Sequence, residues 1–136
     1  MAENTAEEAA LRQGQTFVWH ELYSPDPDAS KKFYEAALGL GSTSMDMGEG
    51  GSYTMLTRDG KAVCGVQDTS LPQMAGVPTH WAVYLSVDDV DARVSAVEAH
   101  GGKLVVPAMD VPTIGRMALI ADPQGAHIWL FTSAPM

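Results

Sequence analysis

Residues Thr79–Ala92, THWAVYLSVDDVDA, decide the fold. Apolar and mixed residues alternate along Thr79–Val87, which predicts a strand. The carboxylates of Asp88-Asp89 can accept the free N–H groups of a helix's first turn. Valines recur at helical spacing through Val90–Val97, and Gly101 follows the predicted helix. The stretch therefore predicts a strand, a cap and a helix in succession.

The same order occurs earlier in the chain. Thr16–Tyr23 (TFVWHELY) is predicted as a strand, and the turn that follows offers Asp26 as a cap. A helix is predicted over Ala29–Leu38, and Gly39 is suited to end it. With Asp26 and Asp88 as matching positions, the repeat offset is 88 − 26 = 62 residues.

Three predicted strands follow each helix. They are Ser42–Met47, Ser52–Thr57 and Ala62–Gln67 in the first half, and Lys103–Met109, Arg116–Ala121 and Ala126–Phe131 in the second. We expect an α+β fold of two βαβββ modules, about 16–67 and 79–132, forming a curved eight-stranded sheet around a cup-shaped cavity. They make one domain, 16–136, with 68–78 as linker and 1–15 as a mobile acidic tail.

Composition narrows the class of protein. The 136 residues include 8 Lys or Arg and 17 Asp or Glu, a net charge of −9, so nucleic acid and anionic lipid are not expected partners. No signal peptide or apolar run of membrane-spanning length is found, and Cys64 is the single cysteine. These features favour a cytoplasmic protein without disulfides.

The order and spacing of several motifs resemble the vicinal oxygen chelate superfamily, which includes glyoxalases, bleomycin-resistance proteins and extradiol dioxygenases. The motifs are Trp19–Leu22 (WHEL), Asp26–Tyr34 (DPDASKKFY), Leu38–Leu40, His80–Ala92, Gly101-Gly102, Gly115–Ala118 (GRMA) and Asp122–Gly125 (DPQG). The resemblance implies a small-molecule site in the cup. It also implies a homodimer, as is common for members of this size.

Metal-dependent members of the superfamily hold a divalent ion through His, Glu or Gln side chains. The resemblance places three ligand positions at Trp19, His80 and Trp129. Tryptophan does not bind a metal, and a lone histidine does not make a tight site. A one-residue slip would bring in His20, but alternation turns that side chain to the helix-covered face. We therefore predict no cofactor and no metal site, with a divalent metal as the open alternative.

Strand alternation assigns the residues that face the cup. We predict ligand contacts from Phe17, Trp19, Glu21, Tyr23, His80, Tyr84, Met117, Leu119, His127, Trp129 and Phe131. We place Tyr53 and Met55 on opposite faces of their strand, and the pattern does not show which of the two faces the cup.

Each of these residues also has a purely structural interpretation. Trp19 and Trp129 can bind a flat ligand or fill the cup by packing on each other. Glu21 and His80 are candidate proton-transfer groups or a hydrogen-bonded structural pair. We interpret His20, His100 and Arg116 as surface or structural groups, with Arg116 paired to an acid, and Cys64 as a buried inert thiol.

Three functions follow from these assignments. The first is binding of an aromatic or hydrophobic metabolite or antibiotic, as in the bleomycin-resistance branch, without metal and without catalysis. The second is a glyoxalase-like lyase, isomerase or cyclase using Glu21 and His80 as catalytic residues, with or without a divalent metal. The third is an interaction module whose cup is collapsed.

Overall fold

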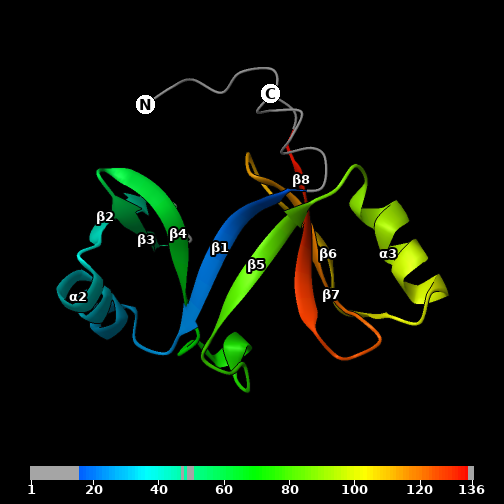
Figure 1. The fold of residues 1–136 in the computed structure, drawn as a ribbon, viewed down its shortest axis with the longest axis horizontal. Coiled ribbons are helices and arrows are strands. Elements are labelled where there is room, and N and C mark those ends of the chain that lie inside the picture. Colours follow the sequence, from blue (N-terminus) through cyan, green and yellow to red (C-terminus); the bar gives the residue numbers. More distant parts are fainter. Residues whose placement is uncertain (1–15, 47, 49–50, 135–136) are drawn as a thin grey trace. The chain divides into compact units, whose positions relative to one another are not determined.

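The computed structural model describes residues 16–46, 48 and 51–134 of the chain (Figure 1). Its elements are β1 (Phe17–Ser24), α2 (Pro27–Leu38), β2 (Gly41–Asp46), β3 (Ser52–Arg58), β4 (Lys61–Asp68), the 3-10 helix η2 (Pro72–Met74), β5 (His80–Ser86), α3 (Val90–Ala99), β6 (Lys103–Val111), β7 (Gly115–Ala121) and β8 (His127–Ser133). The strands follow the order β2-β3-β4-β1-β5-β8-β7-β6 in an eight-stranded mixed sheet. The α+β class and the two βαβββ runs are confirmed.

The observed bounds differ from the predicted ones mainly at the ends of elements. Helix α2 begins at Pro27 rather than Ala29, because Asp26 caps it by accepting a hydrogen bond from the Ala29 N–H at 3.0 Å. Proline suits a first helical position, where no N–H is needed. The predicted linker holds the short helix η2. The predicted tail 1–15, Met47 and part of the turn that follows it lie outside the described residues.

One compact unit is Trp19–Ala82. In it, β1 runs parallel to β4, and β3 is antiparallel to both β2 and β4. Its core consists of Leu22, Leu56, Cys64 and Val66, with Tyr34 of α2 and Leu40 packed against them. Cys64 is buried as expected, and burial raises the pKa of its thiol.

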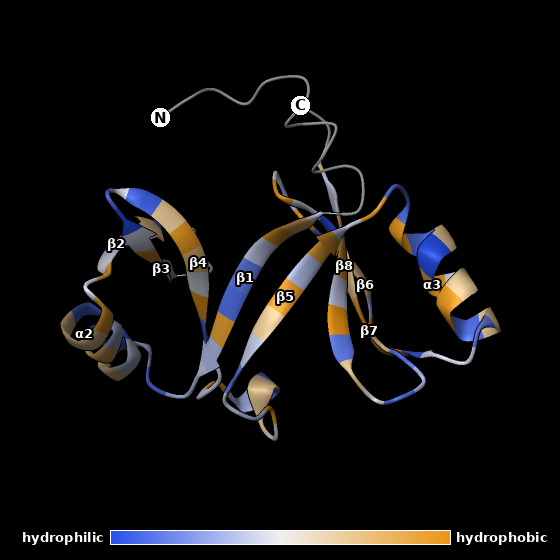
Figure 2. Ribbon diagram, in the orientation of Figure 1, coloured by the Kyte–Doolittle hydropathy of each residue, from blue (hydrophilic) through white to orange (hydrophobic). Residues whose placement is uncertain are grey.

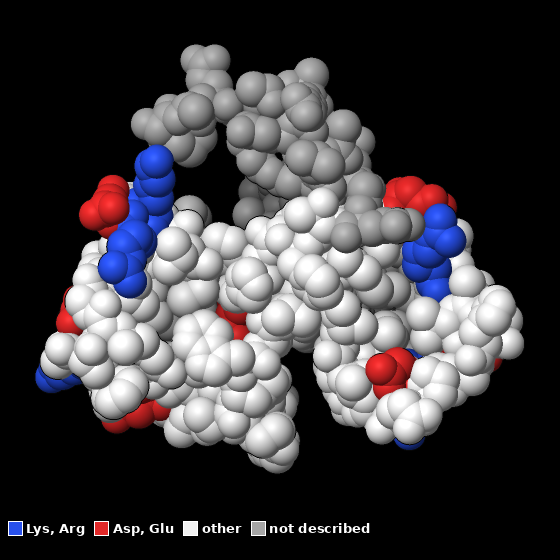
Figure 3. Space-filling model, in the orientation of Figure 1, with Lys and Arg blue, Asp and Glu red and all other residues white. Residues whose placement is uncertain are grey.

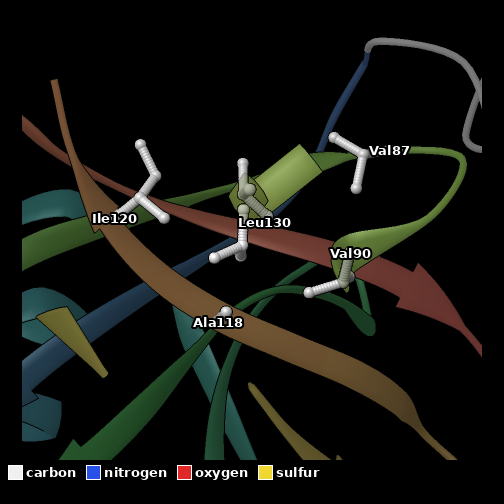
Figure 4. Packing of buried hydrophobic residues seen from close by; sticks show 6 residues of the cluster. Val87, Val90, Ala118, Ile120 and Leu130 are labelled. Carbon is white, nitrogen blue, oxygen red and sulfur yellow. The ribbon is translucent and has the colours of Figure 1, made fainter. Parts of the chain in front are cut away.

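The second compact unit comprises residues 16–18 and 83–134. In it, β5 runs parallel to β8, and β7 is antiparallel to β6 and β8. Figure 4 shows the side chains of its core turned toward one another. The buried members are Val87, Val90, Val94, Ala118, Ile120 and Leu130, of which Val90 and Val94 come from α3.

These two cores fix the orientation of the strand residues. Leu22 of β1, Ala118 of β7 and Leu130 of β8 lie in the cores, on the side where the helices pack. Because successive strand residues point to opposite faces, Glu21 and Trp129 lie on the faces away from the helices. Figure 2 shows hydrophobic and hydrophilic bands along β1 and β8.

Charged side chains form small separate groups on the face shown in Figure 3. Arg116 bonds both oxygens of Asp91 at 3.0 Å and one oxygen of Asp110 at 3.1 Å. Arg93 likewise makes a bidentate contact, with one hydrogen bond to each carboxylate oxygen of Asp88. The expected pairing of Arg116 with an acid is confirmed, and because these groups are exposed their pairs contribute little to stability.

In the described part of the chain, neither α-helix has the length and apolar character that a bilayer-spanning segment requires.

Candidate functional site

A chain of hydrogen bonds lies on the face of unit Trp19–Ala82 that points away from α2. The Trp19 indole N–H donates to the Tyr53 hydroxyl at 3.3 Å. The Tyr53 hydroxyl in turn donates to Oε2 of Glu21 in a short contact. Glu21 is only 6% exposed. A buried carboxylate is thus stabilised by an aromatic hydroxyl that is itself polarised by an indole.

The space for this contact comes from Gly65. On β4, Gly65 pairs with Glu21 of β1 on one side and with Met55 of β3 on the other. A Cβ built on Gly65 would overlap the Tyr53 hydroxyl and Oε2 of Glu21. The missing side chain therefore allows the Tyr53 ring to cross β4 and reach Glu21.

The electrostatics of the pair follow from its position. The pKa of the Tyr53 hydroxyl is raised far above the ordinary value for a phenol. Burial is the larger cause, and the nearby Glu21 carboxylate is the second. The hydroxyl is therefore a hydrogen-bond donor at every physiological pH. The arrangement supplies a fixed donor beside a buried acceptor.

His80 and Tyr23 form the second feature of the same unit. Their rings stack with centroids 4.8 Å apart and planes 13° from parallel. Nδ1 of His80 lies 2.7 Å from the Pro78 carbonyl oxygen. Only a donor can bond to a carbonyl oxygen, so Nδ1 of His80 carries a proton in this contact.

In the other unit, Tyr84 and Trp129 face each other across the parallel strands β5 and β8. Their rings stack with centroids 5.4 Å apart and planes 9° from parallel. Trp129 is 8% exposed. The antiparallel register sets Leu119 beside Trp129 and Met117 beside Phe131. These five residues form an apolar, largely aromatic group on one sheet face.

Three of the predicted residues are exposed to solvent, namely Phe17, His80 and His127. Nδ1 of His127 is 3.1 Å from the Gly125 carbonyl oxygen. Of the two proposed proton-transfer groups, Glu21 contacts Tyr53, whereas His80 contacts Tyr23 and Pro78. The proposed pairing of Glu21 with His80 stays a prediction, as does the cup.

Sequence reasoning missed the role of Tyr53. Tyr53 and Met55 do not lie on opposite faces, because residues two apart on a strand share a face. The register confirms this, since Leu56 pairs with Cys64 in the core of this unit. The buried Leu56 was the signal that could have placed both side chains on the Glu21 face.

Gln67 was missed as well. It pairs with Tyr23 across β1 and β4, as Trp129 pairs with Tyr84 across β8 and β5. The separation of 129 − 67 = 62 residues equals the repeat offset. Gln67 therefore takes in the first module the position that Trp129 takes in the second.

A family model agrees with this architecture. The model for the Glyoxalase/Bleomycin resistance protein/Dioxygenase superfamily matches residues 16–130. The chain belongs to this superfamily.

Two relatives illustrate the range of names found within the superfamily. CFP32 of Mycobacterium tuberculosis, whose name describes a candidate glyoxylase, is 40% identical over 120 residues. DnrV of Streptomyces peucetius, named as an anthracycline biosynthesis protein, is 39% identical over 120 residues. The matches cover 88% and 80% of this chain, but only 45% and 44% of those proteins. The chain thus spans less than half the length of these relatives.

Solved structures share the fold at low sequence identity. A hypothetical protein, BH1468 of Bacillus halodurans, matches with a TM-score of 0.63 at 12% identity, covering 90% of this chain and 96% of that one. A methylmalonyl-CoA epimerase variant of Streptomyces coelicolor matches with a TM-score of 0.60 at 21% identity, covering 89% and 96%. These likenesses concern the fold alone.

Two of the three residues at the metal-ligand positions that the resemblance implies are tryptophans, which do not coordinate a metal. The Trp19 indole nitrogen is a donor only, and its N–H is used on Tyr53. Trp129 stacks on Tyr84. Within residues 16–46, 48 and 51–134, no three His, Cys, Asp or Glu side chains are grouped so that they could hold an ion.

Proposed function

We propose that this superfamily member binds a flat aromatic or hydrophobic small molecule, in the manner of the bleomycin-resistance branch and without a metal. The observation that carries the proposal is that the indoles of Trp19 and Trp129 contact tyrosines, and the resemblance implies metal ligands at these two positions. The name of a Streptomyces relative supports it, because an anthracycline is a flat aromatic compound.

The proposal assigns the residues by chemistry. Trp19, Tyr23 and His80 offer aromatic faces in one unit, and Tyr84 and Trp129 do so in the other. Aromatic pairs contribute about 0.5–1.5 kcal/mol each beyond the area they bury. Glu21 and His80 would orient the ligand through polar contacts, while Met117, Leu119 and Phe131 add apolar surface.

The experiment is a fluorescence titration with 2-(hydroxymethyl)anthraquinone, a flat probe that quenches tryptophan. Trp19→Phe and Trp129→Phe are expected to weaken binding by about 3- to 10-fold each, the equivalent of one aromatic contact. Trp81→Phe is the matched control, since Trp81 is 47% exposed and contacts Tyr34 of α2. Unchanged affinity in both test variants, or no binding by the unaltered protein, would contradict the proposal.

A glyoxalase-like lyase, isomerase or cyclase is the second candidate. It is favoured by the buried Glu21 and by His80, whose Nε2 is the ring nitrogen not engaged with the Pro78 carbonyl, because carboxylates and imidazoles are common proton-transfer groups. Turnover of the hemithioacetal of methylglyoxal and a thiol, followed by thioester absorbance, tests this reaction class. Glu21→Gln is expected to abolish turnover, and full activity in that variant would exclude Glu21 as the base.

We also propose that the protein is a homodimer, that it is cytoplasmic, and that it binds neither nucleic acid nor membranes. The net charge of −9 supports the last part, because phosphate groups would be repelled. Light scattering after size-exclusion chromatography tests the dimer, and a mass equal to the 14.5 kDa chain would contradict it.

A further inference from the structure

Tyr53 and Gly65 stand out because they are part of the Glu21 site without being among the residues expected to touch a ligand. Tyr53 comes from β3 and Gly65 from β4, whereas Glu21 comes from β1. The hydroxyl of Tyr53 lies where a Cβ of residue 65 would otherwise be. Any larger residue at position 65 would therefore push Tyr53 away from Glu21.

We propose that Tyr53, admitted by Gly65, is a positioning residue that holds the Glu21 carboxylate as an oriented anion, so that the site selects aromatic ligands carrying a hydroxyl donor. The inference rests on the proposed binding function. Burial of Glu21 disfavours its charged form, and hydrogen bonds donated to the carboxylate oppose that effect. The Tyr53 hydroxyl makes such a bond to Oε2, and the Trp19 N–H strengthens it by polarising that hydroxyl.

An anionic carboxylate accepts hydrogen bonds and donates none. A ligand hydroxyl that reaches Glu21 thus gains a charge-assisted hydrogen bond. The corresponding methyl ether has no hydrogen to donate. Its oxygen and the Glu21 carboxylate are both acceptors, so no hydrogen bond forms between them. Selection of the alcohol over the ether is the functional consequence of the Tyr53 contact.

The protein contains a matched control for Tyr53. The Trp81 indole N–H donates to the Tyr34 hydroxyl at 3.3 Å, the same distance as in the Trp19–Tyr53 bond. Tyr34 packs against the core on the α2 side of this unit. Tyr34→Phe therefore removes an equivalent indole–hydroxyl bond without altering the surroundings of Glu21.

The first measurement needs no ligand. The three tryptophan indole N–H signals are recorded by two-dimensional NMR and assigned with single Trp→Phe variants. Gly65→Ala, Tyr53→Phe and Glu21→Gln are each expected to shift the Trp19 signal, whereas Tyr34→Phe shifts only the Trp81 signal. A Trp19 signal that stays in place in folded Gly65→Ala and Glu21→Gln proteins would overturn the positioning role.

The second measurement compares 2-(hydroxymethyl)anthraquinone with 2-(methoxymethyl)anthraquinone. The unaltered protein is expected to prefer the alcohol by about tenfold, the usual effect of one hydrogen bond to a charged group. Tyr53→Phe and Gly65→Ala should remove most of this preference, and Tyr34→Phe should keep it. A retained preference in the two test variants would overturn the proposal.

The two measurements separate this inference from the proposed function. If neither probe binds the unaltered protein, the proposed binding function and the ligand selection are both contradicted, while the NMR shifts still decide whether Tyr53 positions Glu21. If both probes bind equally well, the binding function is supported and the ligand selection is overturned. Should Gly65→Ala fail to fold, Tyr53→Phe and Glu21→Gln decide the outcome.

Discussion

The Tyr53 phenol resists ionisation because burial and the Glu21 carboxylate both oppose a second negative charge beside it. In the unfolded chain the same group has an ordinary pKa of about 10. Above that pH the unfolded state loses a proton that the folded state retains. The contribution of Tyr53 to stability is therefore full below about pH 10 and declines as the pH rises further.

Tyr53→Phe is expected to flatten this alkaline decline. Without the Tyr53 hydroxyl, the folded and unfolded states differ by one bound proton fewer at alkaline pH. The decline of the unfolding free energy between pH 10 and 11 should therefore become less steep by up to about 1.4 kcal/mol per pH unit. Urea unfolding at a series of pH values measures the slope. Glu21→Gln should have a smaller effect in the same direction, and an unchanged slope in Tyr53→Phe would contradict the assignment.

Helices α2 and α3 each begin after an aspartate that caps them. Asp26 accepts from the Ala29 N–H at 3.0 Å and Asp89 from the Ala92 N–H at 3.1 Å. These caps were readable from the sequence, because an Asp before an apolar helical pattern has a local role. The ends of the helices depend on neighbouring residues only, which is why they were predicted to within two residues.

Asp89→Ala is expected to lower the unfolding free energy by about 1 kcal/mol, because an N–H of the first turn of α3 loses its partner. Thermal unfolding followed by circular dichroism measures the change. Asp89→Asn retains an oxygen that can accept this bond, and it should recover most of the loss. Equal destabilisation by both substitutions would mean that the cap is not responsible.

Strand β3 carries the best-buried side chain of its unit. Leu56 is 0% exposed and packs in the core with Leu22, Cys64 and Val66. Leu56→Ala is expected to cost about 2–5 kcal/mol of unfolding free energy, because a cavity remains after truncation. Leu38→Ala, at a residue of α2 that is 56% exposed, is the control and should cost far less. Chemical denaturation compares the two variants.

For the protein as a whole, the proposed metal-free binding makes a direct prediction. Dialysis against EDTA should leave the affinity for 2-(hydroxymethyl)anthraquinone unchanged, because Trp19 and Trp129 do not coordinate ions. Elemental analysis of the purified protein serves as the parallel measurement. A loss of affinity that Zn²⁺ or Mn²⁺ restores would show that ligands other than those expected hold a metal.

Most of the architecture could be predicted from the sequence because of its internal repeat. A strand, an Asp cap and a helix recur at an offset of 62 residues, and period-two alternation places Leu22 and Leu130 in the cores. Such patterns are local, so they need no knowledge of which strands are neighbours. With Leu22 and Leu130 in the cores, the same alternation places their neighbours Glu21 and Trp129 on the other faces.

The partners of the candidate site were decided only by the tertiary structure. Glu21, Tyr53 and Gly65 meet because β1 pairs in parallel with β4 and β4 pairs with β3 in one particular register. A shift of one residue would turn Tyr53 to the core side. The spacing of apolar residues along one strand carries no information on that register, so the sequence alone revealed the carboxylate but not the hydroxyl that holds it.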